Sequence, residues 1–380
     1  MRFNPVKHTD NLTIVPADNK RLWNCFVKFP YRYYKNDPNW VPPLLADQKV
    51  LLNPKKHPFY RHAKSQFFLA LRDSRAVGRI AAIVDDTHNT FHNEKTGHFG
   101  FFECEEKYET AERLLAVAKT WIKNQGMKNF RGPANPCQNE DCGLLIDAFD
   151  SPPAVMMTYN PHCYVQYFEK FGLEKAMDFY AYLIEGKNPP PKKLVRIAGK
   201  VREKENLVVR PLEMKNYNDE VKKVHHIYNN AWSKNWGFVP MTGDEFSHLA
   251  KTLKHVITPE YALIAELNGE PVGFSLSIPD INQALIHTNG RLFPLGFLKL
   301  LHYSKKIDMI RIIVMGVVQK YRRLGIDAIF YLDTWRNAIA NGIMRGEMSW
   351  ILENNKMMNR AARMLGGKVY KTYRMYEMKI

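Results

Sequence analysis

Apolar residues follow two patterns along this chain: continuous short runs, which are typical of buried strands, and spacings of three to four residues, which are typical of helices. Two pairs of runs are each split by a short polar turn, one pair in each half: 67–72 and 76–85 around Asp73-Ser74-Arg75, and 261–266 and 271–278 around Leu267-Asn268-Gly269-Glu270. A polar turn between two such runs predicts a β-hairpin. The pattern therefore predicts one hairpin in each half of the chain.

The patterns that follow each hairpin indicate a mixed α/β arrangement. In the first half we expect a strand at 98–104 and then a helix with apolar residues at helical spacing: Leu114, Leu115, Ala118, Trp121 and Ile122. In the second half we expect a strand at 310–318 and then a helix whose apolar face holds Ile329, Leu332, Trp335, Ile339 and Ile343. A strand at 347–352, a helix at 356–365 and a strand at 369–378 that closes the sheet complete the prediction.

The two halves resemble each other at a fixed offset of 195 residues (272 − 77). This offset aligns identical residues over most of the chain: Val77-Gly78 with Val272-Gly273, Pro16 with Pro211, Ala70 with Ala265, Asp85 with Asp280, and Gly172 with Gly367. We interpret the register as a duplication. Three prolines at 189–191 mark a stiff linker, and a short basic helix with Leu194, Ile197 and Val201 on one side is expected after them. The predicted domains are 1–186 and 206–380, with a linker at 187–205.

A basic turn stands between the predicted strand at 310–318 and the helix after it. The turn reads Tyr321-Arg322-Arg323-Leu324-Gly325-Ile326-Asp327. A strand that turns sharply into a helix aims several backbone N–H groups at one point beside the positive end of the helix dipole. Such a turn can hold a pyrophosphate. At the corresponding place in the first half, 104–112 contains no glycine and four carboxylates, so we expect only the second half to bind a phosphate.

The turn resembles the acyl-CoA-binding motif of the GNAT superfamily of N-acyltransferases, which reads Arg or Gln, two residues, Gly, one residue, then Gly or Ala. Asp327 departs from the last position. The order of elements is also that of the GNAT fold, so the resemblance implies two tandem GNAT-like domains of α/β (α+β) class. Each would have a mixed, mostly antiparallel central sheet flanked by helices. It implies acetyl-CoA or a longer acyl-CoA as co-substrate, held by Val317, Val318, Tyr321, Arg322, Arg323, Leu324, Gly325, Ile326, Asp327 and Asn355.

Acylation of an amine needs a base for the ammonium and an acid for the CoA thiolate. Many GNAT enzymes place a Tyr on the last short helix, but the matching positions here are Ala362 and Phe168. We therefore expect Tyr373 or Tyr370 to replace the acid. Glu353 is the candidate base, with Glu347 as second choice. The segment 353–355 also fits a helix N-cap.

Two further segments have two interpretations each. The polar stretch 132–143 and the segment 158–162 suit either ordinary turns or an acceptor pocket, whose candidate residues are Asn135, Asn139 and Tyr159. The stretch 292–301 holds seven Leu and Phe residues between basic flanks. It predicts either a core helix or an apolar lid that holds an acyl chain or makes peripheral contact with an anionic membrane.

Composition narrows the class of protein. The chain has 55 Lys and Arg against 38 Asp and Glu, a formal charge of +17 that favours anionic partners. The basic residues are spread out and form no nucleic-acid-binding motif, so no specific nucleic acid partner is expected. Five cysteines with no secretory signal predict reduced thiols in the cytoplasm. The spacing of these cysteines fits no common zinc module, so no metal is expected. No apolar run reaches 18 residues, so no membrane-spanning helix is expected.

The sequence therefore predicts a cytoplasmic N-acyltransferase that moves an acyl group from acyl-CoA directly to a primary amine in a ternary complex. Among N-acyltransferases, an N-acetyltransferase is the first choice. The acceptor would be the amine of a small molecule, a peptide or a protein. Two alternatives remain: a cell-wall aminoacyltransferase-like protein that uses aminoacyl-tRNA, and a non-catalytic acyl-CoA or metabolite binder. Oligomeric state stays undetermined.

Overall fold

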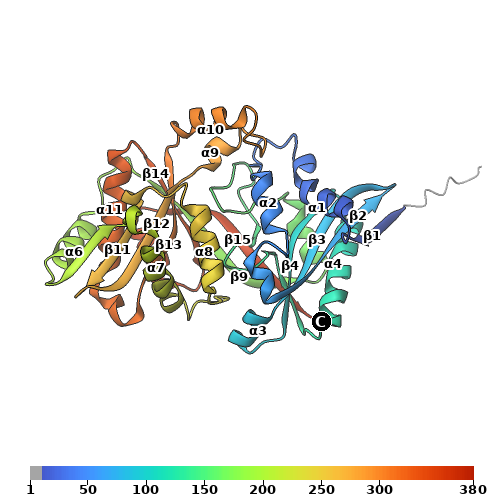
Figure 1. The fold of residues 1–380 in the computed structure, drawn as a ribbon, viewed down its shortest axis with the longest axis horizontal. Coiled ribbons are helices and arrows are strands. Elements are labelled where there is room, and N and C mark those ends of the chain that lie inside the picture. The colour runs from blue at the N-terminus through green and yellow to red at the C-terminus, as the bar shows by residue number, and fades with distance from the viewer. Residues whose placement is uncertain (1–10) are drawn as a thin grey trace, which may run out of the picture.

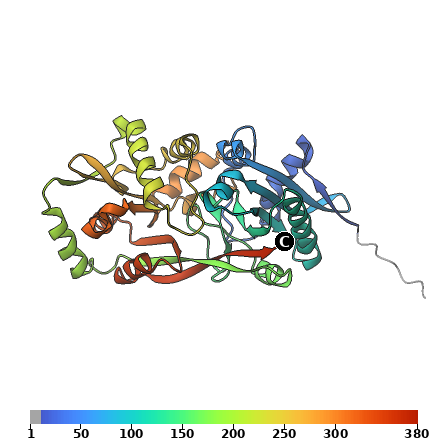
Figure 2. The same cartoon turned by 90° about the horizontal axis from the view of Figure 1, so that it is seen from below.

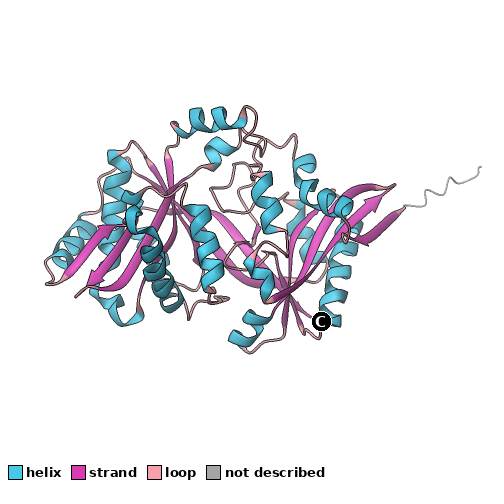
Figure 3. Cartoon of the chain, viewed as in Figure 1, coloured by secondary structure: helices cyan, strands magenta, loops and turns pink. Residues whose placement is uncertain are grey.

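The computed structural model describes residues 11–380 (Figure 1). One continuous sheet of 13 strands runs through both halves of the molecule, and a second, two-stranded sheet pairs β6 with β7. Helices pack around the strands of each half (Figure 3). The sheet therefore joins the two halves by hydrogen bonds instead of leaving them as separate bodies.

The first half supplies nine strands and five α-helices in the described chain. In order they are β1 (Leu12–Pro16), α1 (Lys20–Tyr33), α2 (Leu45–Leu51), β2 (Ala63–Arg72), β3 (Arg75–Asp85), α3 (Asp86–His92), β4 (Thr96–Cys104), α4 (Tyr108–Asn124), β5 (Asn129–Gly132), β6 (Ala134–Asn135), β7 (Asp141–Cys142), β8 (Leu144–Leu145), α5 (Cys163–Lys170) and β9 (Glu174–Glu185). The predicted hairpin, strand and helix of this half are confirmed.

The second half follows a linker helix, α6 (Lys192–Arg202), which buries Leu194 and Val201 as predicted, whereas Ile197 is only partly buried and Ala198 is buried in addition. Its elements are β10 (Leu207–Pro211), α7 (Tyr217–Ala231), α8 (Gly243–Leu253), β11 (Ala262–Leu267), β12 (Glu270–Pro279), α9 (Asn282–Leu285), α10 (Gly296–Ser304), β13 (Met309–Val317), α11 (Ile326–Ala340), β14 (Arg345–Leu352), α12 (Lys356–Met364) and β15 (Lys368–Lys379). The strands and the short helix predicted in this half are confirmed within two residues at each end. The helix predicted to carry Ile329 to Ile343 ends at Ala340, so Ile343 lies beyond it, and Ile339 is exposed.

The duplication is visible in the strand register. Strands β1 and β10 begin 195 residues apart (207 − 12) and end at the aligned prolines. Across the two hairpins, Ala70 lies opposite Gly78, and Ala265 lies opposite Gly273. Two halves with the same cross-strand pairs at the same offset are structural repeats.

The last strand of each half is exchanged with the other half. Strand β15, at the C-terminal end of the chain, pairs with β5 of the first half, and β9 pairs with β14 of the second half. The two exchanged strands also pair with each other in antiparallel fashion and run side by side between the halves (Figure 2). The strand predicted at 369–378 therefore completes the sheet of the first half, not of its own half. The division at 186 and 206 describes the sequence repeat, whereas each spatial half contains one strand from the other.

The apolar stretch 292–301 is not a core helix. Helix α10 lies on the surface beside α9 (Figure 1), and the side chains of Phe293, Leu295, Phe297, Leu298 and Leu301 are all exposed. None of these side chains lines the large cavity described below, so the interpretation of this stretch as a lid that holds an acyl chain has no support in this arrangement.

Candidate active site

The basic turn between β13 and α11 has the sharp geometry that its sequence predicts. A short 3₁₀ segment, Gln319–Leu324, leads into Gly325, which adopts a left-handed conformation (φ = 79°), and α11 starts at Ile326. Arg323 is exposed at the turn, whereas the guanidinium of Arg322 donates to the carbonyls of Val317 and Ala231. The turn thus combines a helix N-terminus with basic side chains, a combination that suits a pyrophosphate.

The missing side chain of Gly325 matters for packing rather than for ligand access. A Cβ at this position would point at helix α6, 3.2 Å from Val201 Cγ2 and 3.7 Å from Ile197 Cγ2. A larger residue at 325 would therefore strain the turn and crowd α6 before it reached a bound phosphate. Asp327, in the first turn of α11, is partly buried, and this burial raises the pKa of its carboxyl.

Strands β13 and β14 separate beyond their first few residues. They pair in parallel only from Met309 opposite Arg345 to Ile312 opposite Met348. On its other edge β13 carries a bulge at Ile313, where the register with β12 shifts. A bulge bends a strand away from its neighbour, so the two strands diverge and leave a gap, called here the β13–β14 gap.

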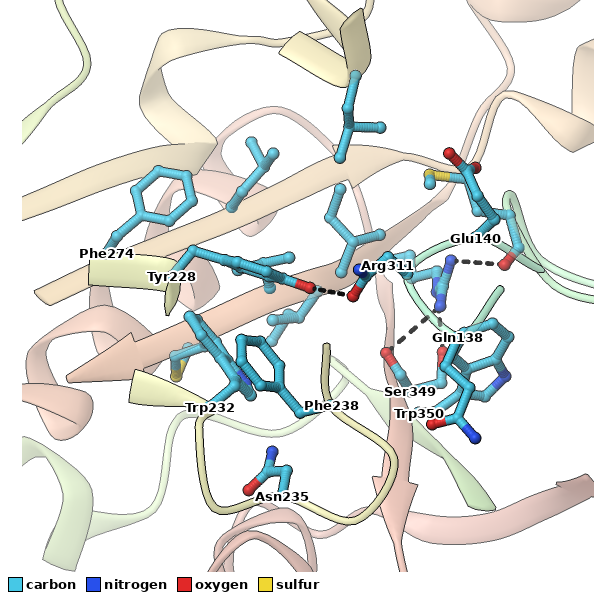
Figure 4. Close-up of a pocket in the computed structure, with 18 of the residues that line it drawn as sticks. Gln138, Glu140, Tyr228, Trp232, Asn235, Phe238, Phe274, Arg311, Ser349 and Trp350 are labelled. Carbon is cyan, nitrogen blue, oxygen red and sulfur yellow. Dashed lines mark hydrogen bonds between the residues drawn. The ribbon is translucent and has the colours of Figure 1, made fainter. Parts of the chain in front are cut away.

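A cavity of about 290 Å³ passes from the β13–β14 gap to the space beneath α7 and α8. Its gap end is lined by β13, β14, Asn355 and Met358, and its far end by apolar side chains of the two helices and of β12: Val221, Val224, Phe246, Leu249, Leu253, Phe274 and Leu276. Figure 4 shows Tyr228, Trp232 and Phe238 together on one side of the cavity. An apolar channel that opens onto a strand gap can hold a long alkyl chain.

One wall of the cavity is polar and comes largely from the first half. The loop containing β7 contributes Gln138, Asn139, Glu140 and Asp141, opposite Arg311 and Ser349 of the second half (Figure 4). Arg311 is buried; it donates to Ser349 Oγ at 2.8 Å and to the Val155 carbonyl at 2.6 Å. Arg311 therefore fixes a first-half loop against β14, and both halves build the site.

Glu140 and Asp141 are the two carboxyl groups that line this cavity. Burial, with a contribution from the nearby Asp141 and Glu245 carboxylates, raises the pKa of Glu140 to about 8. Burial also raises the pKa of Asp141, and the charge of Arg311 opposes this rise. The Glu140 side chain is 21% exposed, lines the cavity and lies 3.7 Å from His57 Nε2. A carboxyl with a pKa near that of an amine is suited to exchange a proton with it.

The residues predicted as base and acid lie elsewhere. The Glu353 carboxylate accepts from Lys175 Nζ at 2.7 Å and from the Asp178 amide at 3.2 Å, outside the cavity lining. Glu347 is fully buried and is bound by Ser349 and Tyr370. Both carboxylates therefore have structural partners and are poorly placed to meet an incoming amine.

Tyr373 is fully buried behind the cavity wall, in β15. Its hydroxyl has no hydrogen-bond partner in the described structure, and burial raises its pKa well above the usual value. The ring packs with Phe179 and Met177 in a core cluster. Of the two tyrosines predicted as the acid, Tyr370 is the one with a carboxylate partner, Glu347. Neither tyrosine lines the cavity.

Of the predicted acceptor residues, only Asn139 lines the cavity. It accepts from the Tyr228 hydroxyl at 2.9 Å and donates to the Val239 carbonyl at 3.0 Å, so it ties the two halves together. Asn135 accepts from the Phe101 amide within the first half, and Tyr159 donates to Asp37 at 2.9 Å. Asn355 caps α12 through the Met358 amide and also lines the gap, so both interpretations of its role stand together.

Comparisons with known proteins agree with this geometry. No family model matches the chain. Among solved structures, a tandem GNAT protein from the clavulanic acid biosynthesis pathway superposes with a TM-score of 0.56 at 10% identity, covering 97% of this chain and 98% of that one. The GCN5-related glucosamine N-acetyltransferase region of a fungal GH3 β-N-acetylglucosaminidase gives 0.57 at 14% identity, covering 97% and 38%. The chain therefore has a tandem GNAT fold.

Within that fold class, two curated proteins are related along the whole chain. The bacterial ceramide synthase of Caulobacter vibrioides (strain NA1000 / CB15N) is 36% identical over 374 residues, which cover 97% of both chains. Protein YghO of Escherichia coli (strain K12) is 34% identical over 372 residues, covering 95% of this chain and 94% of YghO. The chain belongs to the family that contains these two proteins.

Over residues 11–380, no group of three or more His, Cys, Asp or Glu side chains is placed to hold a metal ion. Over the same residues, no helix has both the length and the apolar character needed to cross a bilayer.

Proposed function

We propose that the protein is an acyl-CoA-dependent N-acyltransferase that joins a long acyl chain to the amine of a long-chain amino alcohol, forming an amide of the ceramide type. The observation that carries the proposal is the apolar cavity that continues from the β13–β14 gap to the space beneath α7 and α8. A small amine and an acetyl group would leave most of that apolar surface unused. The relative named as a bacterial ceramide synthase supports the same substrate class.

The residues of the second half fit an acyl-CoA. The N-terminus of α11 and the exposed Arg323 would hold the diphosphate. The pantetheine arm would lie in the β13–β14 gap beside Met315, with Asn355 and Met358 at its entrance. Backbone N–H groups of β13 that no longer face β14 would stabilise the oxyanion that forms on the thioester carbonyl.

The acceptor amine would enter at the polar wall made by Gln138–Asp141. Glu140, whose pKa is about 8, takes the proton that the ammonium must lose. The neutral amine then attacks the thioester carbonyl, a C–N bond forms, and the C–S bond breaks. As the amide forms, its nitrogen loses a second proton; the departing CoA thiolate takes up this proton, and the first proton leaves Glu140 for solvent. The acyl and alkyl chains are held by the apolar walls throughout.

The proposal predicts a preference for long chains on both substrates. We expect CoA release from palmitoyl-CoA in the presence of sphinganine, and release at least tenfold slower with acetyl-CoA or with a short amino alcohol such as ethanolamine. Each CH₂ buried in the cavity contributes up to about 0.8 kcal/mol, so a few suffice for that ratio. The measurement is thiol release with mass-spectrometric identification of the amide.

A cavity variant makes the test specific. Val224 lies in the α7 wall, so Val224→Trp should shorten the apolar channel and shift the preferred acyl chain to a shorter length, while CoA alone binds as before. Val208→Trp, on the exposed edge strand β10, is the matched control and should change neither. Equal rates with acetyl- and palmitoyl-CoA, transfer from aminoacyl-tRNA instead, or tight CoA binding without turnover of any long-chain amine would each overturn the proposal.

A further inference from the structure

The surface around α10 exposes more large apolar side chains than any other described segment. Five side chains within nine residues are between 50% and 87% exposed: Phe293, Leu295, Phe297, Leu298 and Leu301, called here the α10 patch. Scattered single exposures are ordinary, but a contiguous group of this kind marks an interaction site. The patch lies outside the cavity lining and has no role in the proposed chemistry.

The patch is set in a segment of one charge sign. From Ile281 to Ile307 the sequence contains no Asp or Glu, but it contains Arg291, Lys299, Lys305 and Lys306. All four cations are exposed. Apolar side chains surrounded by cations form the pattern of a helix that lies on an anionic membrane surface, where the apolar side enters the acyl boundary and the cations meet phosphates.

Contacts with both halves of the chain hold the α10 segment in place. The Tyr303 ring stacks on His287 with centroids 3.6 Å apart, which holds α10 against the segment after α9. The Leu45 amide donates to the Gly290 carbonyl at 2.9 Å, and Asn282 donates to the Pro153 carbonyl at 3.0 Å. Both halves of the chain therefore support the segment, and the exposed apolar side chains are the ones left over after it has packed.

We propose that the α10 patch docks the protein on an anionic lipid bilayer. A second copy of the chain fits less well, because a twofold interface would bring the same four cations of each copy together. An anionic bilayer instead neutralises these cations while it buries the five apolar side chains. The proposal rests on the exposure and charge of the α10 segment alone, so it stands whether or not the acyl-transfer proposal holds.

The test is flotation with lipid vesicles at two compositions and two salt concentrations. The purified full chain should float with vesicles of phosphatidylcholine and phosphatidylglycerol at 7:3 in 0.1 M NaCl. It should bind at least tenfold more weakly to phosphatidylcholine alone, and binding to the mixed vesicles should fall in 0.5 M NaCl because salt screens the cations. If the protein does not float with the mixed vesicles in 0.1 M NaCl, the proposal is wrong.

Two variants separate the apolar and ionic contributions. Phe297→Asp/Leu301→Asp should weaken binding to mixed vesicles at least tenfold, and Lys305→Glu/Lys306→Glu should do so mainly at low salt. Val208→Asp is the control, because Val208 is 53% exposed, as is Phe297, but lies on β10. An unchanged melting temperature confirms that each variant folds. Binding that survives both variants, or a wild-type dimer that the aspartate pair dissolves, would show that the patch serves another partner.

Discussion

The two halves of this chain share a fold and a repeat offset of 195 residues, but only the second half has an open gap between its two parallel strands. In the second half, β13 and β14 separate and leave a gap that continues into the cavity. In the first half, β4 and β5 separate in the same way after His98 and Arg131, yet the gap is filled. The Phe101 amide donates to Asn135 Oδ1 at 2.5 Å across it, and Gly100 lies so close to Ala134 that a Cβ would overlap its carbonyl.

The space between helix and sheet differs in the same way. Beneath α7 and α8 the second half has a cavity, whereas beneath α1 the first half has a packed aromatic core that includes Phe26, Phe29, Phe67 and Phe101. The turn before α4 holds Glu105, which pairs with Arg72 at 2.9 Å and has no glycine beside it. The closed first half nevertheless supplies a wall, Gln138–Asp141, to the cavity of the second half.

The sharpest contrast is between two partly buried carboxyls with raised pKa values. Glu140 lines the cavity, whereas Glu103 lies in the first-half core, where Tyr34 and Tyr164 donate to it and burial raises its pKa to about 7. We expect Glu140→Gln to lower kcat by roughly 10²- to 10⁴-fold, the usual loss of a general base. Glu103→Gln should leave kcat within about twofold and change stability by about 1 kcal/mol. Equal kcat losses would contradict the assignment.

The pH dependence of Glu140 provides a second readout on the same variant. As a base it acts when deprotonated, so kcat should rise with pH through about 8 and this limb should vanish in Glu140→Gln. Its folded pKa exceeds the ordinary value of 4.5, so its contribution to stability is full below about 4.5 and is lost as the pH rises through about 8. Glu140→Gln should therefore raise stability at pH 8, by on the order of 1–2 kcal/mol. A lower melting temperature at pH 8 would count against the raised pKa.

Filling the β13–β14 gap tests whether the open gap is the feature that allows the second half, and not the first, to bind acyl-CoA. Met315 lines the β13–β14 gap, so Met315→Trp should weaken palmitoyl-CoA binding by about 1–3 kcal/mol, or roughly 10- to 100-fold, because the larger ring overpacks the gap. The matched change in the first half, Asn135→Ala, leaves the Phe101 amide without its acceptor and should cost about 1–3 kcal/mol of stability. Calorimetry with palmitoyl-CoA should show normal affinity in Asn135→Ala. Loss of affinity there would mean that the first-half gap takes part in binding.

The smallest expected effect concerns the two turns before α11 and α4. Arg323→Ala should weaken CoA binding by about 1.5 kcal/mol, roughly tenfold, if its guanidinium meets the diphosphate. Lys107, exposed just before α4 of the first half, is the matched control, and Lys107→Ala should leave the affinity unchanged. Calorimetry with CoA itself compares the two, since CoA lacks the acyl chain that the cavity would hold. Equal losses would indicate long-range electrostatics rather than a contact in the turn.

Local pattern predicted most of the fold. The hairpin turns at Asp73-Ser74 and Asn268-Gly269, the strand-to-helix turn at Gly325 and the linker helix all appear where residue types and spacing place them. The exchange of β9 and β15 was not predictable in this way. The alternation of residues in β9 and in β15 suits pairing within its own half as well as pairing with the other half. The choice of partner depends on how the two halves pack together, which the sequence pattern does not show.

The site was harder to predict, for a related reason. The sequence indicates 132–143 and 158–162 as candidate pocket segments, but Asn135 and Tyr159 make hydrogen bonds within the first half, and the pattern does not single out Glu140 and Asp141, which line the cavity. A carboxylate in a polar loop looks solvated in sequence. The second half provides what the sequence does not show: Arg311 holds the neighbouring loop through the Val155 carbonyl, and burial together with the Glu245 carboxylate of α8 raises the pKa of Glu140.

The number of acyl-CoA molecules bound per chain tests the central contrast most directly. Isothermal titration of the purified protein with palmitoyl-CoA, below its micellar concentration, should give one site per chain, and Met315→Trp should weaken that site while Asn135→Ala should not. Two sites per chain, or a single site that responds to Asn135→Ala and not to Met315→Trp, would contradict the account that the first half is closed and the second half binds the acyl donor.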